Sequence, residues 1–218
     1  MRAGVTAARA VAPAGGYRSY EEVLAPNVYY DRTHDMEAAK ILPGEYYATG
    51  REIVLVTVLG SCVAGCIRDP DFGIGGMNHF MLPDSAEQVD APASASARYG
   101  NYAMEMLINQ LVKLGARRHR LEAKVFGGGN VLRGLTVANV GQRNADFVLR
   151  YLGVEGIPVL AQDLVDVYPR KVYYFPRTGK VRVKKLRDMH NDTIFEREQD
   201  YGSRLRRSEI RGEVELFS

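Results

Sequence analysis

The sequence predicts an α+β fold, a single domain in which a mixed, layered β-sheet core is flanked by helices. Three observations lead to this class: short β-branched runs between turn residues, two stretches with helical periodicity, and 46% hydrophobic residues in a chain of 218, enough for a sizeable core. We expect the domain to span residues 43–186. A loosely ordered N-terminal arm over 1–42 and a charged, helical C-terminal tail over 187–218 are expected to flank it.

The first three strands are expected close together in the sequence. Residues 53–59 form a continuous aliphatic run, the composition of a buried strand, and Gly60 and Ser61 end it. A second strand is expected over 62–67. Turn formers fill the next six positions, and a third strand over 74–82 then ends at a proline.

Helices and strands alternate in the second half of the chain. Residues 94–114 carry an apolar stripe at helical spacing, and Gly115 ends it. A strand over 121–126 runs into a glycine run, which we attribute to crowded backbone because no Lys-Ser or Lys-Thr of a phosphate loop follows. Capping-box spacing predicts a second helix over 139–151, closed by Gly153. A strand over 157–164 and a hairpin of 171–175 with 180–186 complete the core.

One cysteine and one histidine of this chain are placed so that they could meet. Cys62 follows the first strand and its glycine turn, and His79 lies seventeen residues later in the third strand. If the hairpin between them turns at Pro70 and Asp71, the two residues are directly opposed, with Cβ atoms roughly 5 Å apart on one face. A thiol beside an imidazole makes a nucleophile and its base. The spacing fits equally well a small buried cysteine and a satisfied core histidine.

At these residues the sequence resembles the chemoreceptor glutamine deamidase family, CheD. The resemblance runs in family order from about residue 43 to residue 186. By this resemblance Cys62 is the nucleophile, His79 the base and Thr57 the third residue of the site. The matching segments are 57–64 (TVLGSCVA), 76–83 (GMNHFMLP), 124–130 (KVFGGGN) and 140–144 (VGQRN).

Two positions need a second interpretation beside the resemblance. Thr57 is also simply a good strand residue, which is the better explanation from the sequence alone. After the strand of 157–164 the family usually has a glycine pair, whereas this chain has Val165 and Asp166.

The resemblance implies a protein-glutamine deamidase that works by acyl transfer. The Cys62 thiolate attacks the carboxamide carbon of a glutamine, and backbone N–H groups around Gly60 and Ser61 hold the oxyanion. His79 then protonates the departing ammonia and activates water against the thioester. No metal or organic cofactor is needed. The implied substrates are cytoplasmic helices of methyl-accepting chemotaxis receptors, and in some family members a CheC-type phosphatase is a partner.

Composition and hydropathy limit the partners and the cellular compartment that we expect for the protein. A net charge of +3 is too small to imply a polyanionic partner by itself, so no nucleic acid is expected. No apolar run reaches membrane-spanning length, and the first sixteen residues lack the apolar core of a secretory signal. Cys62 and Cys66 on one strand would lie roughly 13 Å apart, too far for a disulfide. We therefore expect a cytoplasmic protein without membrane insertion.

Other functions remain open at this point. The chain could be a non-catalytic regulatory module that binds chemoreceptors or a CheC-type partner. A protease or a transglutaminase would share the acyl-thioenzyme step. A structural metal site of Cys62, Cys66, His79 and one further ligand is disfavoured by the small number of candidate ligands. The basic stretch 170–187, with eight basic residues and no acidic one, fits a docking face for an acidic protein or nucleic acid, but better a solvated edge strand.

Overall fold

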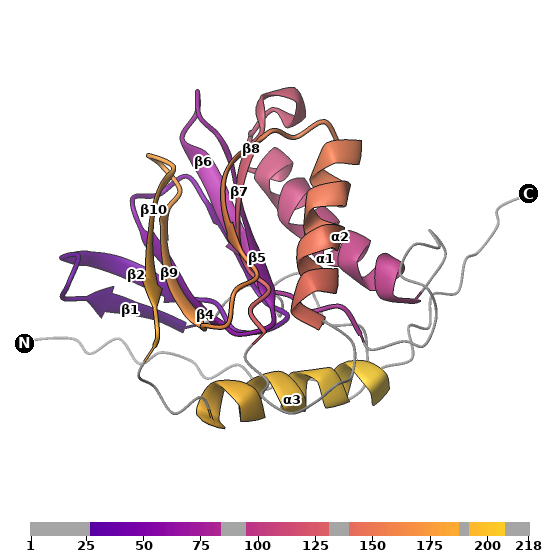
Figure 1. The fold of residues 1–218 in the computed structure, drawn as a ribbon. Helices are drawn as coiled ribbons and strands as arrows, with labels where there is room; N and C mark the ends of the chain where they lie inside the picture. Colours follow the sequence, from indigo (N-terminus) through magenta and orange to yellow (C-terminus); the bar gives the residue numbers. More distant parts are fainter. Residues whose placement is uncertain (1–26, 84–94, 131–139, 188–191, 208–218) are drawn as a thin grey trace, which may run out of the picture.

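The fold was analysed in a computed structural model that describes residues 27–83, 95–130, 140–187 and 192–207 (Figure 1). The predicted α+β class and layered core are confirmed: two five-stranded sheets pack face to face. The first sheet has the order β1 (Asn27–Asp31), β2 (Met36–Lys40), β4 (Val54–Leu59), β9 (Arg170–Phe175) and β10 (Lys180–Lys185). The second has the order β3 (Tyr46–Thr49), β6 (Ile74–Asn78), β5 (Val63–Asp69), β7 (Glu122–Gly127) and β8 (Val159–Leu164). Both sheets are mixed, because β2 pairs with β4 and β7 with β8 in parallel.

The helices cover the second sheet and close one end of the molecule. α1 (Ala95–Lys113) and α2 (Val140–Val154) pack their apolar stripes on its outer face, and a short 3-10 helix, η2 (Arg118–Arg120), precedes β7. The inner face of this sheet meets the first sheet through aliphatic and sulfur-containing side chains. α3 (Asp192–Arg207) lies across the ends of both sheets (Figure 1).

The structure corrects three boundaries that the sequence predicted. Residues 27–40 were assigned to a loosely ordered arm, but they form β1 and β2 and extend the first sheet beyond β4. The third strand ends at Asn78, after which Phe80 makes one isolated bridge. Gly153 lies inside α2, and the chain turns instead at Gly156, whose φ of 66° suits a glycine. The predicted cap of α2, residue 139, lies outside the described residues.

The basic stretch 170–187 forms the edge of the first sheet. β10 is the last strand, and its exposed basic side chains alternate with Val181 and Val183, which pack on the core. Arg170 is an exception because its side chain is fully buried, where it pairs with Asp163 at 3.1 Å. The solvated edge strand therefore accounts for most of this charge.

Directly after β8, two residues other than glycine adopt a left-handed backbone conformation. Val165 has φ 64° and Asp166 has φ 73°, at the place where the resembled family usually has glycines. The loop is bonded on both sides: the N–H of Val165 donates to the carbonyl of Gly127 at 2.8 Å, and that of Asn130 to the carbonyl of Asp166 at 2.7 Å. The surrounding structure thus holds a backbone conformation that costs a β-branched residue roughly 1–3 kcal/mol.

We expect the change Val165→Gly to raise the free energy of unfolding by about 1 kcal/mol, because relief of strain exceeds the entropy that glycine adds to the unfolded chain. Urea denaturation measures it. The matched control is Val167→Gly, an exposed valine outside the residues with positive φ, which should destabilise the protein. Equal losses in both variants would contradict the strain at Val165.

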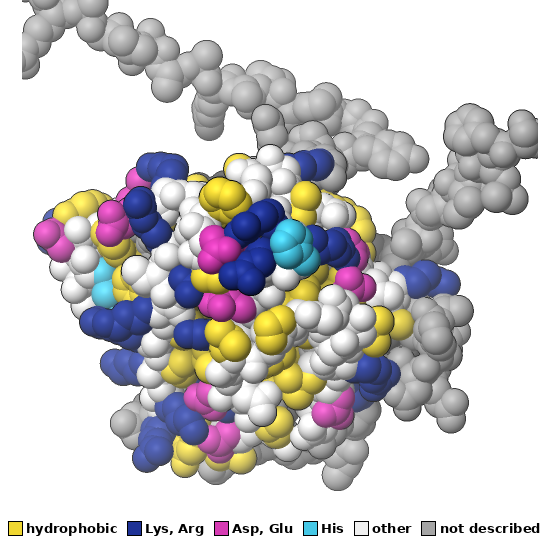
Figure 2. All heavy atoms as spheres, turned by 90° about the horizontal axis from the view of Figure 1, so that it is seen from above, with side chains coloured by type: hydrophobic (Ala, Val, Ile, Leu, Met, Phe, Trp, Pro, Cys, Tyr) yellow, Lys and Arg dark blue, Asp and Glu magenta, His cyan; other side chains and the backbone are white. Residues whose placement is uncertain are grey.

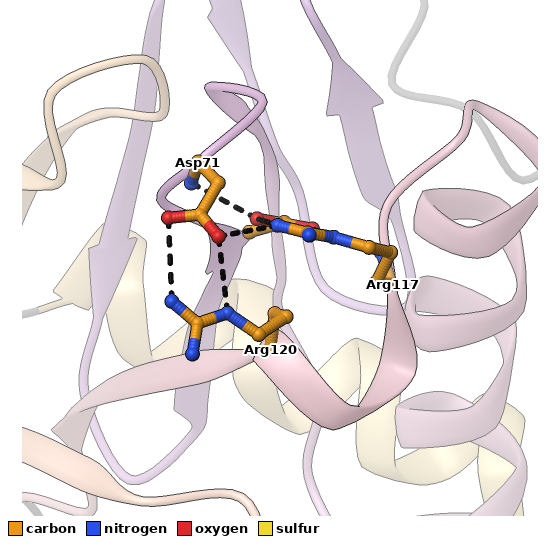
Figure 3. Close-up of polar contacts among 4 residues, drawn as sticks. Asp71, Arg117 and Arg120 are labelled. Atoms are coloured by element: carbon orange, nitrogen blue, oxygen red, sulfur yellow. Dashed lines mark hydrogen bonds and ion pairs between the residues drawn. The ribbon is translucent and has the colours of Figure 1, made fainter.

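A buried carboxylate fixes the turn between β5 and β6, at the end of the molecule away from α3. Asp69 accepts hydrogen bonds from the backbone N–H of Arg117 at 3.0 Å and from its Nε at 3.1 Å. Arg117 and Arg120 also pair with Asp71 (Figure 3). From this end, Lys and Arg side chains lie among acidic and apolar ones (Figure 2). These charges are used within the fold and do not form a patch of one sign.

The pKa of Asp69 predicts a specific acid sensitivity. Burial raises this pKa, but the hydrogen bonds from Arg117 outweigh it and lower the value to about 2. Because the folded pKa lies below the unfolded one, the stabilisation is present above about pH 4 and is lost as the pH falls toward about 2. We expect Asp69→Asn to remove about 2 kcal/mol of this pH dependence, measured by denaturation at several pH values. Asp146→Asn, at an exposed position of α2, is the matched control variant.

Candidate active site

The segment 60–62 crosses from the first sheet to the second, and its backbone is tightly packed. The N–H of Gly129 donates to the carbonyl of Gly60 at 2.7 Å, and that of Gly128 to the carbonyl of Cys62 at 2.8 Å. A Cβ at Gly127 would lie 2.2 Å from the Cys62 carbonyl oxygen. The expectation that these glycines allow close backbone approach is confirmed, and it is the Cys62 loop that they approach.

The predicted pairing between the second and third strands was wrong by two residues. β5 and β6 pair Asp69 with Ile74 and Cys66 with Met77, and Val63 bridges to Phe80. The turn is centred one residue later than expected, since Gly73, with φ 64°, closes it. A slip of two preserves the face on which each side chain lies, whereas a slip of one would have reversed it. The thiol and the imidazole are therefore diagonal neighbours rather than directly opposed.

The cysteine, the histidine and the threonine nevertheless lie together. The Cys62 sulfur, a ring nitrogen of His79 and a carboxylate oxygen of Glu198 are all within 4.8 Å of one another. Thr57 lies in β4 and packs toward the second sheet, with its Oγ1 2.8 Å from His79 Nδ1. All four side chains are buried.

The hydrogen bonds of Thr57 define which nitrogen of His79 can act as a base. The Thr57 hydroxyl donates its single proton to the carbonyl of Ile41 at 2.8 Å. Its oxygen must then accept from Nδ1–H of His79, at 2.8 Å. Nε2 is left with a free lone pair, and it is buried without a hydrogen-bond partner among the described residues. The chain from Ile41 to Thr57 to His79 thus presents Nε2 as a proton acceptor.

The backbone around His79 is also held in place. Its N–H donates to the carbonyl of Glu45 at 3.0 Å, and its carbonyl accepts from the N–H of Gly44 at 2.7 Å. These bonds continue the pairing of β3 with β6 beyond the end of the strands. The imidazole is therefore positioned from both its ring and its backbone.

In this arrangement both reacting groups are neutral near pH 7. Burial lowers the pKa of His79 to about 4. Burial, followed by the negative charge of Glu198, raises the pKa of the Cys62 thiol well above its ordinary value. The cysteine is consequently held as a thiol, the less nucleophilic form.

Glu198, from α3, is the functional residue that the sequence interpretation missed. Its carboxylate accepts hydrogen bonds from the N–H groups of Gly60 and Ser61, both at 2.8 Å, and of Cys62 at 3.2 Å. The Ser61 hydroxyl donates a fourth bond at 2.6 Å. Gly60 and Ser61 were predicted to frame an oxyanion site, and their N–H groups converge on an anion. A signal was available, since Glu198 interrupts the apolar stripe of Ile194 and Tyr201.

Asn144 supports the same loop from α2. Its side-chain amide donates to the carbonyl of Ser61 at 2.8 Å and accepts from the N–H of Leu82 at 2.9 Å. The residue is fully buried on the helix face that meets the core. The sequence interpretation included it in a matching segment but assigned it no role, although a polar residue in a buried stripe is a recognisable signal.

The same side chains must be considered as metal ligands. Cys62, His79 and Glu198 offer one sulfur, one nitrogen and one oxygen within 4.8 Å of one another. The carboxylate of Glu198, however, already accepts hydrogen bonds from four protein donors, so its charge is compensated by the fold. Cys66 is not part of this cluster in the described chain, so the metal set predicted with Cys66 is not assembled there.

Comparison with known proteins identifies the family. Residues 81–185 match the family model described as CheD chemotactic sensory transduction. A "Probable chemoreceptor glutamine deamidase CheD" of Herminiimonas arsenicoxydans is 64% identical over 91% of this chain and 98% of its own. One of Thiobacillus denitrificans is 66% identical over 90% of this chain and 98% of its own. The chain belongs to the CheD family.

Among solved structures, the crystal structure of the hypothetical protein YfiH of Bacillus licheniformis is similar, with 14% identity and a TM-score of 0.32 over 56% of this chain and 49% of that one. Among the described residues of this CheD family member, no helix combines the length and apolar content that a bilayer crossing requires.

A substitution at Thr57 tests the polarisation of His79. Thr57→Val keeps the shape of the side chain and removes the hydroxyl, which leaves Nδ1 of His79 and the Ile41 carbonyl without their partner. We expect turnover to fall about 10-fold to 10²-fold, because the imidazole loses its fixed tautomer. Thr178→Val, in the exposed turn between β9 and β10, is the matched control. Unchanged turnover in a folded Thr57 variant would reduce the site to Cys62, His79 and backbone donors.

Proposed function

We propose that this chain hydrolyses glutamine side-chain amides of chemoreceptors to glutamate and ammonia, with Cys62 as the nucleophile. The observation that carries the proposal is the meeting of a thiol, an imidazole and three backbone N–H groups at the loop of 60–62. Family membership supports it, since the relatives carry the name chemoreceptor glutamine deamidase. Neither a metal nor an organic cofactor takes part in the proposed reaction.

The first half of the reaction forms a thioester. Nε2 of His79 accepts the proton of the Cys62 thiol as the sulfur attacks the carboxamide carbon of the substrate. The negative charge that develops on the carbonyl oxygen is held by the N–H groups of segment 60–62. His79 then returns its proton to the leaving nitrogen, and ammonia departs.

The second half regenerates the enzyme. His79 accepts a proton from water, and the resulting hydroxide attacks the thioester carbon. The same N–H groups hold the second oxyanion, and the bond to sulfur breaks to give glutamate and the Cys62 thiol. Thr57 keeps Nδ1 of His79 protonated in both halves, which is why a single imidazole can serve as acid and base.

The substrates and partners follow from the proposed activity. We propose that the modified glutamines lie on the cytoplasmic helices of methyl-accepting chemotaxis receptors, and that the protein therefore works in the cytoplasm. A CheC-type phosphatase is proposed as a regulatory partner. The central domain of 43–186 would then need β1, β2 and α3 to complete its sheets and cover its site.

Mass spectrometry of receptor fragments tests the proposed function. Incubation with the full chain should add about 1 Da to specific glutamines, the mass change of deamidation, with release of ammonia. The Cys62→Ala variant serves as the blank. The proposal would be refuted if receptor fragments stayed unmodified both with the full chain and with its Glu198→Ala variant.

A non-catalytic regulatory module is the second candidate. The observation that favours it is that Cys62 is fully buried beneath α3 and held as a neutral thiol. Such a module would bind receptor fragments without changing their mass, and alkylation of Cys62 would be as slow as that of Cys66 in every variant.

A further inference from the structure

α3 closes the candidate active site with one continuous face. Ile194, Glu198 and Tyr201 are buried, and Leu205 is half-buried against the core between the sheets. Their spacing of four, three and four residues puts them on one side of the helix. Figure 1 shows this helix lying across the ends of both sheets. Among the described side chains of α3, Glu198 is the charged one at the centre of this buried face. We call the surface that the face covers, which includes segment 60–62, Gly44 and Tyr99, the groove.

One oxygen of Glu198 makes the contacts that the carbonyl oxygen of a substrate would need. Oε1 accepts from the N–H groups of Gly60 and Cys62, Oε2 accepts from that of Ser61, and a carboxylate oxygen is within 4.8 Å of the Cys62 sulfur. Glutamate is the product of the proposed reaction, and it has the size and shape of glutamine. Its carboxylate carbon is therefore where the carbon attacked by Cys62 would lie.

The contacts on either side of Glu198 indicate a surface shaped for a helix. The ring of Tyr201 packs on Gly44, where a Cβ would come within 2.9 Å of that ring. The Tyr201 hydroxyl forms a hydrogen bond with the hydroxyl of Tyr99 on α1. Gly44 also holds the backbone of His79 through its N–H. The groove therefore admits a bulky residue one turn after the central side chain, beside the catalytic base.

We propose that α3 occupies the groove in which the substrate helix binds, with Glu198 in place of the substrate glutamine side chain, so that the chain blocks its own active site until α3 is displaced. The inference rests on the proposed function, because it identifies the groove as that of a helical glutamine substrate. A helix that covers a site for another helix is an intramolecular competitor, and its tether gives it a high effective concentration.

Charge and burial support the blocking role. A carboxylate resists nucleophilic attack, so Glu198 can occupy the site without being consumed. Burial raises the pKa of the Cys62 thiol, and the negative charge of Glu198 raises it further. Displacement of α3 would expose the thiol and remove that charge, which favours the reactive thiolate.

The substitution Glu198→Gln tests the substrate-like position with the full chain. The sulfur of Cys62 should attack the new carboxamide, ammonia should leave with the proton delivered by His79, and water should release glutamate. Tryptic mass spectrometry should find a gain of about 1 Da at position 198, or a loss of about 17 Da where the thioester persists. Combining it with Cys62→Ala should prevent either change. Glu196→Gln and the native Gln199, both at exposed positions of α3, should keep their amides.

The substitution Glu198→Ala tests the blocking role without any receptor. We expect Cys62 to react with iodoacetamide at least about tenfold faster than in the unmodified chain, while Cys66, buried in β5, stays slow. Glu196→Ala removes the same charge from the exposed side of the same helix and should leave the rate unchanged. Thermal unfolding of each variant excludes a general loss of structure.

The outcomes separate this inference from the proposed function. If the Glu198→Gln variant deamidates receptor fragments but keeps its own amide at position 198, the substrate-like position is overturned. The tether returns α3 to the site repeatedly, so a correctly placed amide should react. Alkylation of Glu198→Ala at the unmodified rate, or slower receptor deamidation by this variant, would overturn the blocking role and make Glu198 part of the catalytic machinery. Faster alkylation without deamidation of any glutamine would support the blocking role and refute the deamidase activity.

Discussion

Replacing Cys62 by alanine is expected to abolish ammonia release from receptor fragments, whereas replacing Cys66 by alanine should leave most of the turnover. Cys62 lies in the loop that carries the oxyanion donors, with its sulfur within 4.8 Å of a ring nitrogen of His79. Cys66 lies four residues further along, inside β5, where it pairs with Met77 and Lys124 and its side chain fills the core between the sheets. The chemistry we propose needs only the first thiol.

The two variants control each other, because both remove one buried sulfur. Cys66→Ala should cost about 1 kcal/mol of unfolding free energy through lost packing. Cys62→Ala should keep its fold, since the hydrogen bonds of Gly60 and Ser61 do not involve the sulfur. Ammonia release and thermal unfolding are measured on both. Equal loss of activity in two folded variants would refute the assignment of Cys62 as nucleophile.

The sequence predicted the strands and helices of the core better than it predicted how the strands pair. The aliphatic run 53–59 and the apolar stripe of 94–114 correspond closely to β4 and α1, because each pattern reports burial directly. The turn of 68–73 is rich in turn formers throughout, so its composition does not decide where it is centred. The position of the turn is set by Gly73, whose positive φ is known only from the structure.

β1 and β2 were missed because local patterns do not predict them. Most of β1 is exposed, and β2 joins the sheet by parallel pairing with β4, in which Ala38 lies opposite Val54 although another strand, β3, intervenes in the sequence. Their strand character depends on the sheet edge that they extend. Residues of this kind can be recognised only when the edge itself is known.

The sequence predicted the reacting residues of the candidate site but not the helix that covers them. Cys62, His79 and Thr57 followed from a resemblance in short segments, and the structure brings the three together. Glu198 reaches the same site from more than 130 residues away. No local propensity encodes such a contact. Only the charge within an otherwise apolar helix face pointed to a special environment.

The second large effect is expected at His79, where alanine should reduce turnover by at least about 10²-fold. Nε2 of His79 is buried without a hydrogen-bond partner among the described residues, and Thr57 sets the tautomer that leaves it free to accept a proton. Without it, the thiol must ionise alone in a buried site that already raises its pKa, and ammonia must leave without a positioned proton donor. Both halves of the reaction should therefore slow.

The matched control for this variant is His119→Ala on η2, an exposed histidine far from the site in the sequence. It should keep full activity. His79→Ala should retain the groove and the oxyanion donors, because segment 60–62 is held by Gly128, Gly129 and Asn144 rather than by the imidazole. Receptor fragments should thus still bind, with the loss confined to kcat. A folded His79→Ala variant with near-normal kcat would mean that another group accepts the Cys62 proton.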